Sequence, residues 1–106
     1  CIFVKNYNPN DIKFNNPENI AILNAECGNV IIELYPNISP NAVKRLKKLI
    51  KLGAYDDSAF HRVIEGKLVQ AGDLEFGKRE NLDYGKVGSG KSGLGIIKSE
   101  LDEKFK

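Results

Sequence analysis

The side chains with the most chemical capability lie in one stretch, YDDSAFHRVIEGKLVQAGD, which spans residues 55–73. It holds His61, Arg62 and Gln70 among apolar residues that favour β-strands. These three side chains offer hydrogen bonds and one fixed cation, but no nucleophile or paired carboxylate sits in the same cluster. No His and Cys residues have the spacing of a zinc site. The stretch therefore indicates a peptide-binding surface with one cation and argues against a hydrolase.

Two short strands are expected to present these side chains. The runs AFHRVI and KLVQAG are separated by Glu65-Gly66, which suits a connection between strands. Because side chains alternate between the faces of a strand, Arg62 and Gln70 are predicted to project from one surface, beside Leu68. The same alternation divides the first strand into two faces, with Phe60, Arg62 and Ile64 on one and His61 and Val63 on the other.

A second motif, GKVGSGKS at residues 85–92, has the spelling of a phosphate-binding P-loop. A working P-loop connects a buried strand to a helix N-terminus, where backbone N–H groups hold phosphate. Here the polar run KRENLDY precedes the motif, and Gly93 and Gly95 would weaken a helix after it. We therefore interpret the match as accidental and predict no nucleotide site.

The preceding elements are a hairpin and a helix. The runs IAILNA and VIIELY flank ECGN, in which Gly28-Asn29 is predicted to make the turn. Ser39 is a suitable N-cap, Pro40 suits the first helical position, and Gly53 suits the C-terminal end. The apolar stripe of this helix consists of Ala42, Val43, Leu46, Leu49 and Ile50. Its opposite, basic face is interpreted as solvated, with docking on an anionic surface as the alternative.

Composition sets broad limits on the function. The chain has 106 residues, which suits one small domain with a modest core. Hydrophobic residues make up 42% and charged residues 28%, as in ordinary globular domains. The net charge of +2 gives no reason to expect a nucleic-acid partner. No apolar run reaches the roughly 20 residues of a membrane span. Two cysteines, Cys1 and Cys27, leave the compartment open.

The chain divides near residue 20. Residues 1–19 are rich in Asn and contain two prolines, so they are predicted to form an arm or linker. The apolar residues 1–4 are too short for a whole signal peptide and are consistent with the remnant of a targeting segment. Residues 20–106 are predicted to form one domain, in which residues 74–95 are loop and residues 96–105 start a short strand or helical turn.

The motif FHRVIEGKLVQAGD, at residues 60–73, resembles the pattern F-H-R-V-I-x-G-F-x-x-Q-G-G-D of cyclophilin-type peptidyl-prolyl cis–trans isomerases. The resemblance begins with GNVIIELYPNISPNAVKRLKKLIKLGAYDD, continues to GSGKSGLGIIKSELDEKF, and covers roughly residues 20–106. It implies a mainly β fold with one helix, a cyclophilin-like antiparallel β-barrel of which this sequence holds only the N-terminal half. It also identifies GKVGSGKS as part of that family's glycine-rich loop.

The resemblance implies a role for each site residue. Arg62 is the expected catalytic residue, a donor to the prolyl nitrogen of a twisted X–Pro amide. Gln70 is expected to hold the substrate backbone, His61 to border the site, and Leu68 to line the proline pocket. Lys67 stands where the family has the aromatic floor of that pocket, which disfavours an apolar ring unless the side chain turns outward. Neither a cofactor nor a metal is expected.

The expected partners are proline-containing peptides or unfolded proteins, together with cyclosporin-like ligands, and neither nucleic acid nor a membrane span is expected. The bacterial-like character of the sequence implies the periplasm or the cytoplasm, with the periplasm preferred. The leading hypothesis is a prolyl isomerase that assists protein folding, of which this chain is a fragment. The alternative is a non-catalytic, cyclophilin-like peptide-binding module, which Lys67 and the missing half-barrel favour.

Overall fold

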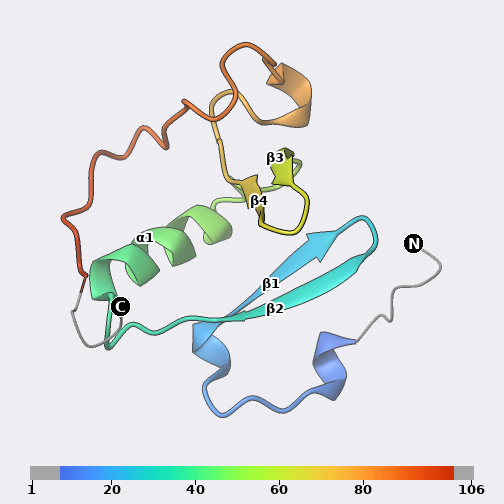
Figure 1. The fold of residues 1–106 in the computed structure, drawn as a ribbon. Helices are drawn as coiled ribbons and strands as arrows, with labels where there is room; N and C mark the ends of the chain where they lie inside the picture. The colour runs from blue at the N-terminus through green and yellow to red at the C-terminus, as the bar shows by residue number, and fades with distance from the viewer. Residues whose placement is uncertain (1–7, 102–106) are drawn as a thin grey trace. The chain divides into compact units, whose positions relative to one another are not determined.

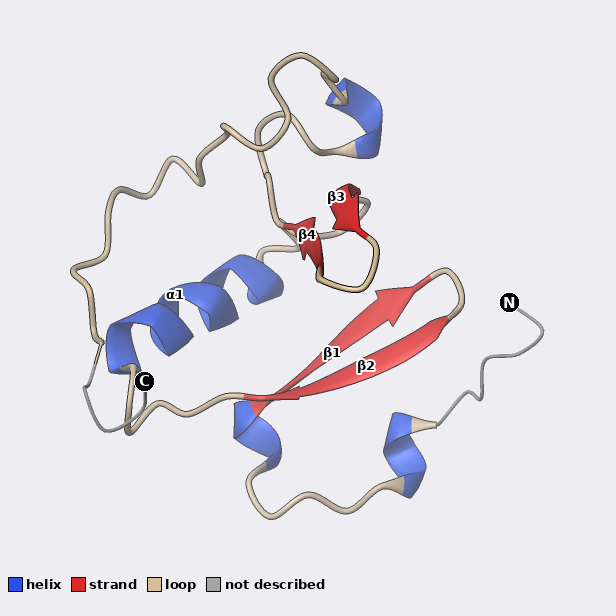
Figure 2. Ribbon diagram, viewed as in Figure 1, coloured by secondary structure: helices blue, strands red, loops and turns tan. Residues whose placement is uncertain are grey.

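The structure, a computed structural model, describes residues 8–101. Within this range the chain forms four strands, one α-helix and three short 3-10 helices. Figures 1 and 2 draw these elements along the chain. The described residues form two compact units, residues 8–43 with 100–101, and residues 44–99. Strands with one helix agree with the predicted composition of the fold. No closed barrel is present among the described residues, whose sheets each have two strands.

The first unit contains an antiparallel hairpin of β1 (Ile20–Ala25) and β2 (Gly28–Glu33). The β-branched and aliphatic residues of both runs suit a pleated strand. The bond from the Leu34 amide to the Asn19 carbonyl, 2.7 Å long, extends the pairing one step beyond the strands. The two strands predicted from the sequence are therefore present, the second beginning earlier than its apolar run.

The turn of this hairpin differs from the prediction. It consists of Glu26 and Cys27, because the backbone ladder closes with Ala25 opposite Gly28. The predicted turn at Gly28-Asn29 is wrong, and both residues belong to β2. The hydrogen bonds between strands are made by backbone groups. They therefore continue through Gly28 and Asn29, although these residues have weak strand propensity, and leave only two residues for the turn.

Two short 3-10 helices precede the hairpin, η1 (Pro9–Asp11) and η2 (Pro17–Asn19). The side chain of Asn8 accepts a hydrogen bond from the amide of Asn10 at 3.0 Å, the local turn chemistry for which Asn is suited. The segment expected to be an arm therefore contains single turns but no strand or α-helix between residues 8 and 19. Residues 1–7 of the predicted arm, including the proposed remnant of a targeting segment, lie outside the described residues.

The helix α1 (Pro40–Lys51) begins and ends where the sequence predicts. Gly53 has φ of 69°, and its amide donates to the Ile50 carbonyl at 3.0 Å. The Ala54 amide donates to the Leu49 carbonyl at 3.0 Å. These two bonds and the left-handed glycine form a Schellman motif, which satisfies carbonyls that the helix leaves unpaired.

The first turn of α1 is capped by a residue that sequence analysis did not select. The carboxylate of Glu100 accepts hydrogen bonds from the amides of Asn41 at 2.9 Å and Ala42 at 3.1 Å. These are the second and third helical residues, whose amides an N-cap side chain normally binds. Ser39 directly precedes the helix, but the acceptor is Glu100, which lies 59 residues after Asn41 and 58 residues after Ala42.

The second unit contains a hairpin of β3 (Phe60–Ile64) and β4 (Leu68–Ala71), joined by a turn at residues 65–67. The Lys67 amide closes this turn by donating to the Ile64 carbonyl at 3.0 Å. Before β3, the Ala59 amide donates to the Gly77 carbonyl at 2.8 Å. The residue before β3 is therefore hydrogen-bonded to the segment that follows β4.

The segment after β4 is predominantly loop, as predicted, with one short 3-10 helix, η3 (Arg79–Asn81). Residues 96–101 form neither the predicted strand nor a helical turn, and residues 102–105 lie outside the described range. The Arg45 guanidinium holds part of this segment by donating to the carbonyls of Gly95 at 2.8 Å and Leu94 at 3.1 Å.

Few large apolar side chains are buried. Among the described residues, the buried hydrophobic side chains are Val43 and Leu49, both on α1. Large hydrophobic residues on all four strands are exposed; they include Ile22, Leu23, Val30, Ile32, Phe60, Val63, Leu68 and Val69. Each two-stranded sheet therefore presents apolar side chains to solvent.

Candidate functional site

Arg62 and Gln70 lie directly opposite each other in the β3–β4 hairpin. Residues that are cross-strand partners project to the same face of a sheet, with their Cβ atoms about 4.5–5.5 Å apart. Both side chains are exposed. The hairpin therefore brings together the guanidinium and the carboxamide that the alternation of side chains predicts on one surface.

The register of this hairpin contains a β-bulge at His61. Phe60 pairs with Ala71 and Arg62 pairs with Gln70, so one residue of β3 has no partner in β4. Because neighbouring residues of β4 face opposite sides, Phe60 and Arg62 also face opposite sides. The predicted face shared by Phe60, Arg62 and Ile64 is therefore wrong for Phe60, since strict alternation does not hold through a bulge.

His61 is half-buried, and both of its ring nitrogens are shielded from solvent without a hydrogen-bond partner among residues 8–101. Buried polar atoms are usually paired, so this ring is unusual among side chains of folded proteins. A Cβ atom placed on Gly88 would lie 3.5 Å from its Nε2 atom. The ring thus faces the backbone of the glycine-rich loop.

Leu68 and Lys67 lie at the turn end of the hairpin. Leu68 pairs with Ile64, two residues along from the Arg62–Gln70 pair, and is therefore on the same face. Lys67 is exposed within the turn at residues 65–67, rather than on a strand. The structure therefore groups Arg62, Gln70 and Leu68 on one face and places Lys67 at its edge.

The carboxylate of Asp73 organises the segment after β4. It is 5% exposed, and one oxygen, Oδ1, accepts from the amides of Glu75 at 3.0 Å and Phe76 at 2.8 Å. The other, Oδ2, accepts from the amides of Gly88 at 2.7 Å and Gly90 at 2.9 Å. The Phe76 amide is the largest cause of a lowered pKa; burial acts in the opposite direction, and together these bonds bring the pKa of Asp73 to about 2.

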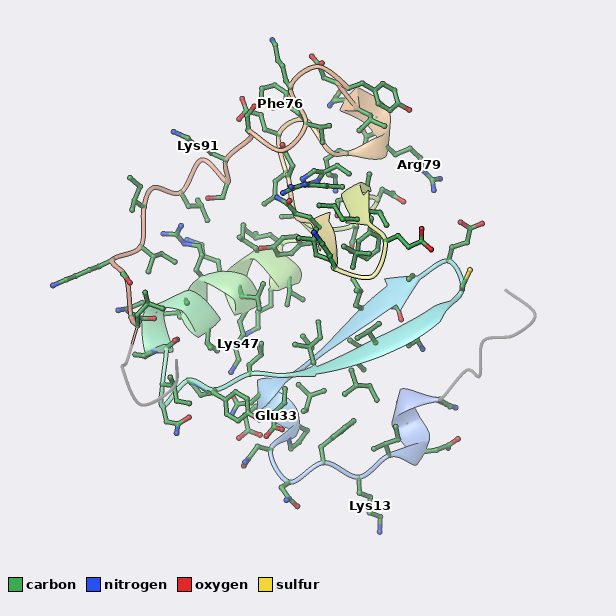
Figure 3. All side chains as sticks on the ribbon, viewed as in Figure 1. Lys13, Glu33, Lys47, Phe76, Arg79 and Lys91 are labelled. Carbon is green, nitrogen blue, oxygen red and sulfur yellow. The ribbon has the colours of Figure 1, made fainter. Side chains whose placement is uncertain are left out.

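These contacts also show what the amides of the P-loop-like motif, residues 85–92, bind in this structure. The amides of Gly88 and Gly90 bind the carboxylate of Asp73, and the Lys91 amide donates to Glu75 at 3.2 Å. The loop therefore holds internal carboxylates where a P-loop would hold phosphate. No helix follows between Ser92 and residue 101, and Lys91 lies on an extended segment (Figure 3). Residues 85–92 therefore differ from a P-loop both in the groups that their amides bind and in the segment that follows them.

Asp73 is the last residue of the motif at residues 60–73, and no role was predicted for it. An Asp followed by polar and glycine-rich residues is a recognisable start of a turn, so the bonds to Glu75 and Phe76 were accessible from sequence. The bonds to Gly88 and Gly90 were not, because they join residues 15 and 17 positions apart through a loop.

The described residues contain neither a group of metal ligands nor a membrane-spanning helix. Between residues 8 and 101, no group of three or more His, Cys, Asp or Glu side chains is placed to hold a metal ion. Over the same range, no helix has the length and apolar character required to cross a membrane. The residues of the β3–β4 face instead offer hydrogen-bond donors and an apolar neighbour to a bound peptide.

Comparison with known proteins gives a consistent result. A family model described as cyclophilin type peptidyl-prolyl cis-trans isomerase/CLD matches residues 20–105. A protein of Brucella suis biovar 1, named probable peptidyl-prolyl cis-trans isomerase, is 41% identical over 88 residues, which cover 82% of this chain and 45% of that protein. Peptidyl-prolyl cis-trans isomerase cypE of Dictyostelium discoideum is 39% identical over 70 residues, covering 65% of this chain and 45% of that protein.

A longer relative, peptidyl-prolyl cis-trans isomerase CYP71 of Arabidopsis thaliana, is 32% identical over 89 residues, which cover 84% of this chain and 12% of that protein. The chain thus spans just under half the length of the Brucella and Dictyostelium relatives. No solved structure matches the chain significantly.

Proposed function

The chain belongs to the cyclophilin-type peptidyl-prolyl cis–trans isomerase family, and on this premise we propose that the intact protein catalyses rotation about X–Pro bonds in peptides and unfolded proteins. The barrier to this rotation is about 18–20 kcal/mol, because rotation removes amide resonance. No bond is broken, so the reaction requires neither a nucleophile nor a cofactor. The enzyme has only to stabilise the twisted amide more than the planar one.

Arg62 is the residue that stabilises the twisted amide. In that state the prolyl nitrogen becomes pyramidal and its lone pair can accept a hydrogen bond, which the planar amide does not allow. A guanidinium held at this nitrogen therefore acts in the transition state rather than the ground state. The observation that carries the assignment is the pairing of Arg62 with Gln70 across the β3–β4 hairpin.

The neighbouring residues bind the substrate. The Gln70 carboxamide, beside Arg62, binds the peptide backbone, and Leu68 on the same face contacts the proline ring. Lys67 borders the ring at the turn, and His61 supports the site from the bulge. Cyclosporin-like ligands, which present a peptide backbone and apolar side chains, are expected to occupy the same face.

The two hairpins are proposed to be parts of a cyclophilin-like antiparallel β-barrel, of which this sequence holds the N-terminal half. Support comes from the exposed apolar residues of both two-stranded sheets and from the family match. Barrel closure would pair the free strand edges and cover these side chains. It would also exclude water around Arg62, which strengthens a charged hydrogen bond.

The test is an isomerase assay of the intact protein with a proline-containing tetrapeptide. Arg62→Ala should lower kcat/KM by about 10²–10³, the usual effect of removing one preorganised donor. Arg79→Ala is the matched control, because Arg79 is also exposed but lies on η3. The melting temperature should change little for either variant. An Arg62→Ala protein with intact catalysis and a much lower melting temperature would show that Arg62 is structural.

A second function, a non-catalytic peptide-binding module, is favoured by one observation. Lys67 is exposed beside Leu68, where the resemblance places an aromatic floor for the proline ring. A cation here suits binding of an acidic peptide better than insertion of an apolar ring. Peptide binding by an intact protein without isomerase activity would support this alternative, and turnover that depends on Arg62 would exclude it.

A further inference from the structure

Asp73 connects the end of the β3–β4 hairpin to the glycine-rich loop. Its two carboxylate oxygens have separate partners: Oδ1 binds the local amides of Glu75 and Phe76, and Oδ2 binds those of Gly88 and Gly90. The first pair shapes the turn after β4, and the second pair attaches the distant loop. One carboxylate therefore joins two segments that are 15 and 17 residues apart in the sequence.

The attached loop contacts the bulge residue of β3. Gly88 has φ of 101°, a conformation that favours glycine. A Cβ atom at Gly88 would lie 3.5 Å from Nε2 and 3.6 Å from Cδ2 of His61. The backbone of Gly88 is thus held between the Asp73 carboxylate and the Nε2 edge of the His61 ring, whose nitrogens have no hydrogen-bond partner in the described part of the chain.

The same turn also contacts the segment that leads into β3. The Gly77 amide donates to the Asp73 carbonyl at 3.2 Å, and the Gly77 carbonyl accepts from the Ala59 amide at 2.8 Å. The Arg79 amide donates to the Asp57 carbonyl at 2.8 Å. The residues before β3 and the ring of the bulge are therefore both supported by the segment that Asp73 organises.

We propose that Asp73 is a positioning residue: by holding the Gly88–Gly90 loop against His61, it fixes the β3 bulge that aims Arg62 to the same face as Gln70. A bulge changes the direction of the side chain that follows it, and bulges occur often beside active sites. The catalytic part of this proposal rests on the proposed isomerase function. The contact between the loop and His61 does not.

The substitution Asp73→Asn separates the two roles of the carboxylate. An Asn side chain keeps one acceptor oxygen, and Asn readily forms the local turn to the Glu75 and Phe76 amides. Its amino group then faces the amides of Gly88 and Gly90, where donor meets donor. The variant should therefore keep the turn after β4 and release the loop.

Glu75→Gln is the matched control, because it also converts an acid to an amide in the same turn. The Glu75 carboxylate accepts a hydrogen bond from the Lys91 amide at 3.2 Å, and a Gln side chain keeps an acceptor oxygen for this bond. Its replacement should leave Gly88 and Gly90 bound to Asp73. Any general effect of losing one negative charge in this turn should appear in both variants.

Three readouts on the intact protein test the proposal. In Asp73→Asn, hydrogen exchange of the Gly88 and Gly90 amides should accelerate while that of the Phe76 amide stays slow. The ring signals of His61, the one histidine of this sequence, should shift in the NMR spectrum. The kcat for a proline tetrapeptide should fall about tenfold with KM little changed, because a misplaced donor weakens the transition state. Glu75→Gln should show none of these changes.

The outcomes are distinguishable. Unchanged Gly88 and Gly90 exchange, an unchanged His61 ring, or full activity despite a released loop would each overturn the proposal. If the wild-type protein is inactive while the loop and ring respond as expected, the isomerase function fails and the anchoring of the loop stands.

A second variant, Gly90→Ala, tests the proposal independently if the Asp73→Asn protein does not fold. A Cβ atom at Gly90 would lie 2.7 Å from Cγ of Asp73, so Gly90→Ala should displace the carboxylate from the loop. Gly85→Ala is its control, since the nearest atom there, Oδ1 of Asp83, is 3.4 Å away. Gly90→Ala should accelerate exchange of the Gly88 amide, shift the His61 ring signals and lower kcat, and Gly85→Ala should resemble the wild type. The opposite pattern would overturn the proposal.

Discussion

At the scale of single residues, the candidate site depends on which side chains lie within one strand pair. Arg62 and Gln70 share a face because they are cross-strand partners, and Leu68 shares it two residues further along. Lys67 lies outside the strands, in the turn, and its ammonium is exposed. The same hairpin therefore supplies the cation that we propose for catalysis and a second cation where an apolar contact would serve better.

Replacement of Lys67 tests this second cation. In the intact protein, Lys67→Phe should raise kcat/KM by about threefold to tenfold, mainly through a lower KM, because burial of an aromatic ring against proline adds about 1 kcal/mol of binding. Glu65→Phe, in the same exposed turn, should have little effect. A decrease in kcat/KM with Lys67→Phe would indicate that the ammonium binds an acidic substrate group.

The carboxylate of Asp73 makes a prediction about acid stability. The pKa of Asp73 is about 2 in the folded protein, below its ordinary value of 3.8. A depressed pKa contributes stability that is fully present above about pH 4 and is lost as the pH falls towards 2. The difference in melting temperature between wild type and Asp73→Asn should therefore be constant near neutral pH and shrink below pH 4. Circular dichroism from pH 2 to 6 measures it, with Leu52→Ala as a control whose offset stays constant.

At the scale of elements, local signals predicted the helix and the strands well. Pro40 and Gly53 mark the two ends of α1, and both of these positions are confirmed. Two features escaped prediction because their causes are distant in the sequence. Glu100 caps α1 from 58 and 59 residues away, and the bulge at His61 depends on the register of β4 and on the Gly88 loop.

The site was predictable to a similar degree. Alternation within strands gave the shared face of Arg62 and Gln70, and the resemblance gave their proposed roles. The face assigned to Phe60 was wrong, because a bulge shifts the alternation by one residue. The anchoring bonds of Asp73 to Gly88 and Gly90 are long-range contacts, which no local pattern encodes.

The packing of α1 is tested by a pair of leucines. Leu49 is 6% exposed and Leu52 is 67% exposed. Leu49→Ala should lower the free energy of unfolding by about 2–5 kcal/mol, since it removes a buried side chain and leaves a cavity. Leu52→Ala should change it by less than about 0.5 kcal/mol. Urea denaturation of both variants compares them directly, and equal losses would show that Leu49 lies outside the core.

At the scale of the whole molecule, the exposure of apolar side chains agrees with the match to under half of the Brucella relative. Two buried hydrophobic side chains among the described residues are few beside the exposed ones, which include Val63 at 65% and Val69 at 64% on β3 and β4. These two valines pair with each other and lie on the face opposite Arg62 and Gln70. Both faces of this hairpin therefore meet solvent, while the Brucella relative is about twice as long as the matched region.

A polypeptide restricted to these 106 residues is expected to be a poor isomerase. A guanidinium in water gains little from a hydrogen bond to the prolyl nitrogen, because water competes for both partners and screens the charge. Its kcat/KM should be at least about 10²-fold below that of the Brucella suis relative measured in the same protease-coupled assay. Arg62→Ala should then cost this short polypeptide little, in contrast to the intact protein. Turnover equal to that of the relative, and sensitive to Arg62→Ala, would show that the β3–β4 face excludes enough water to work without further strands.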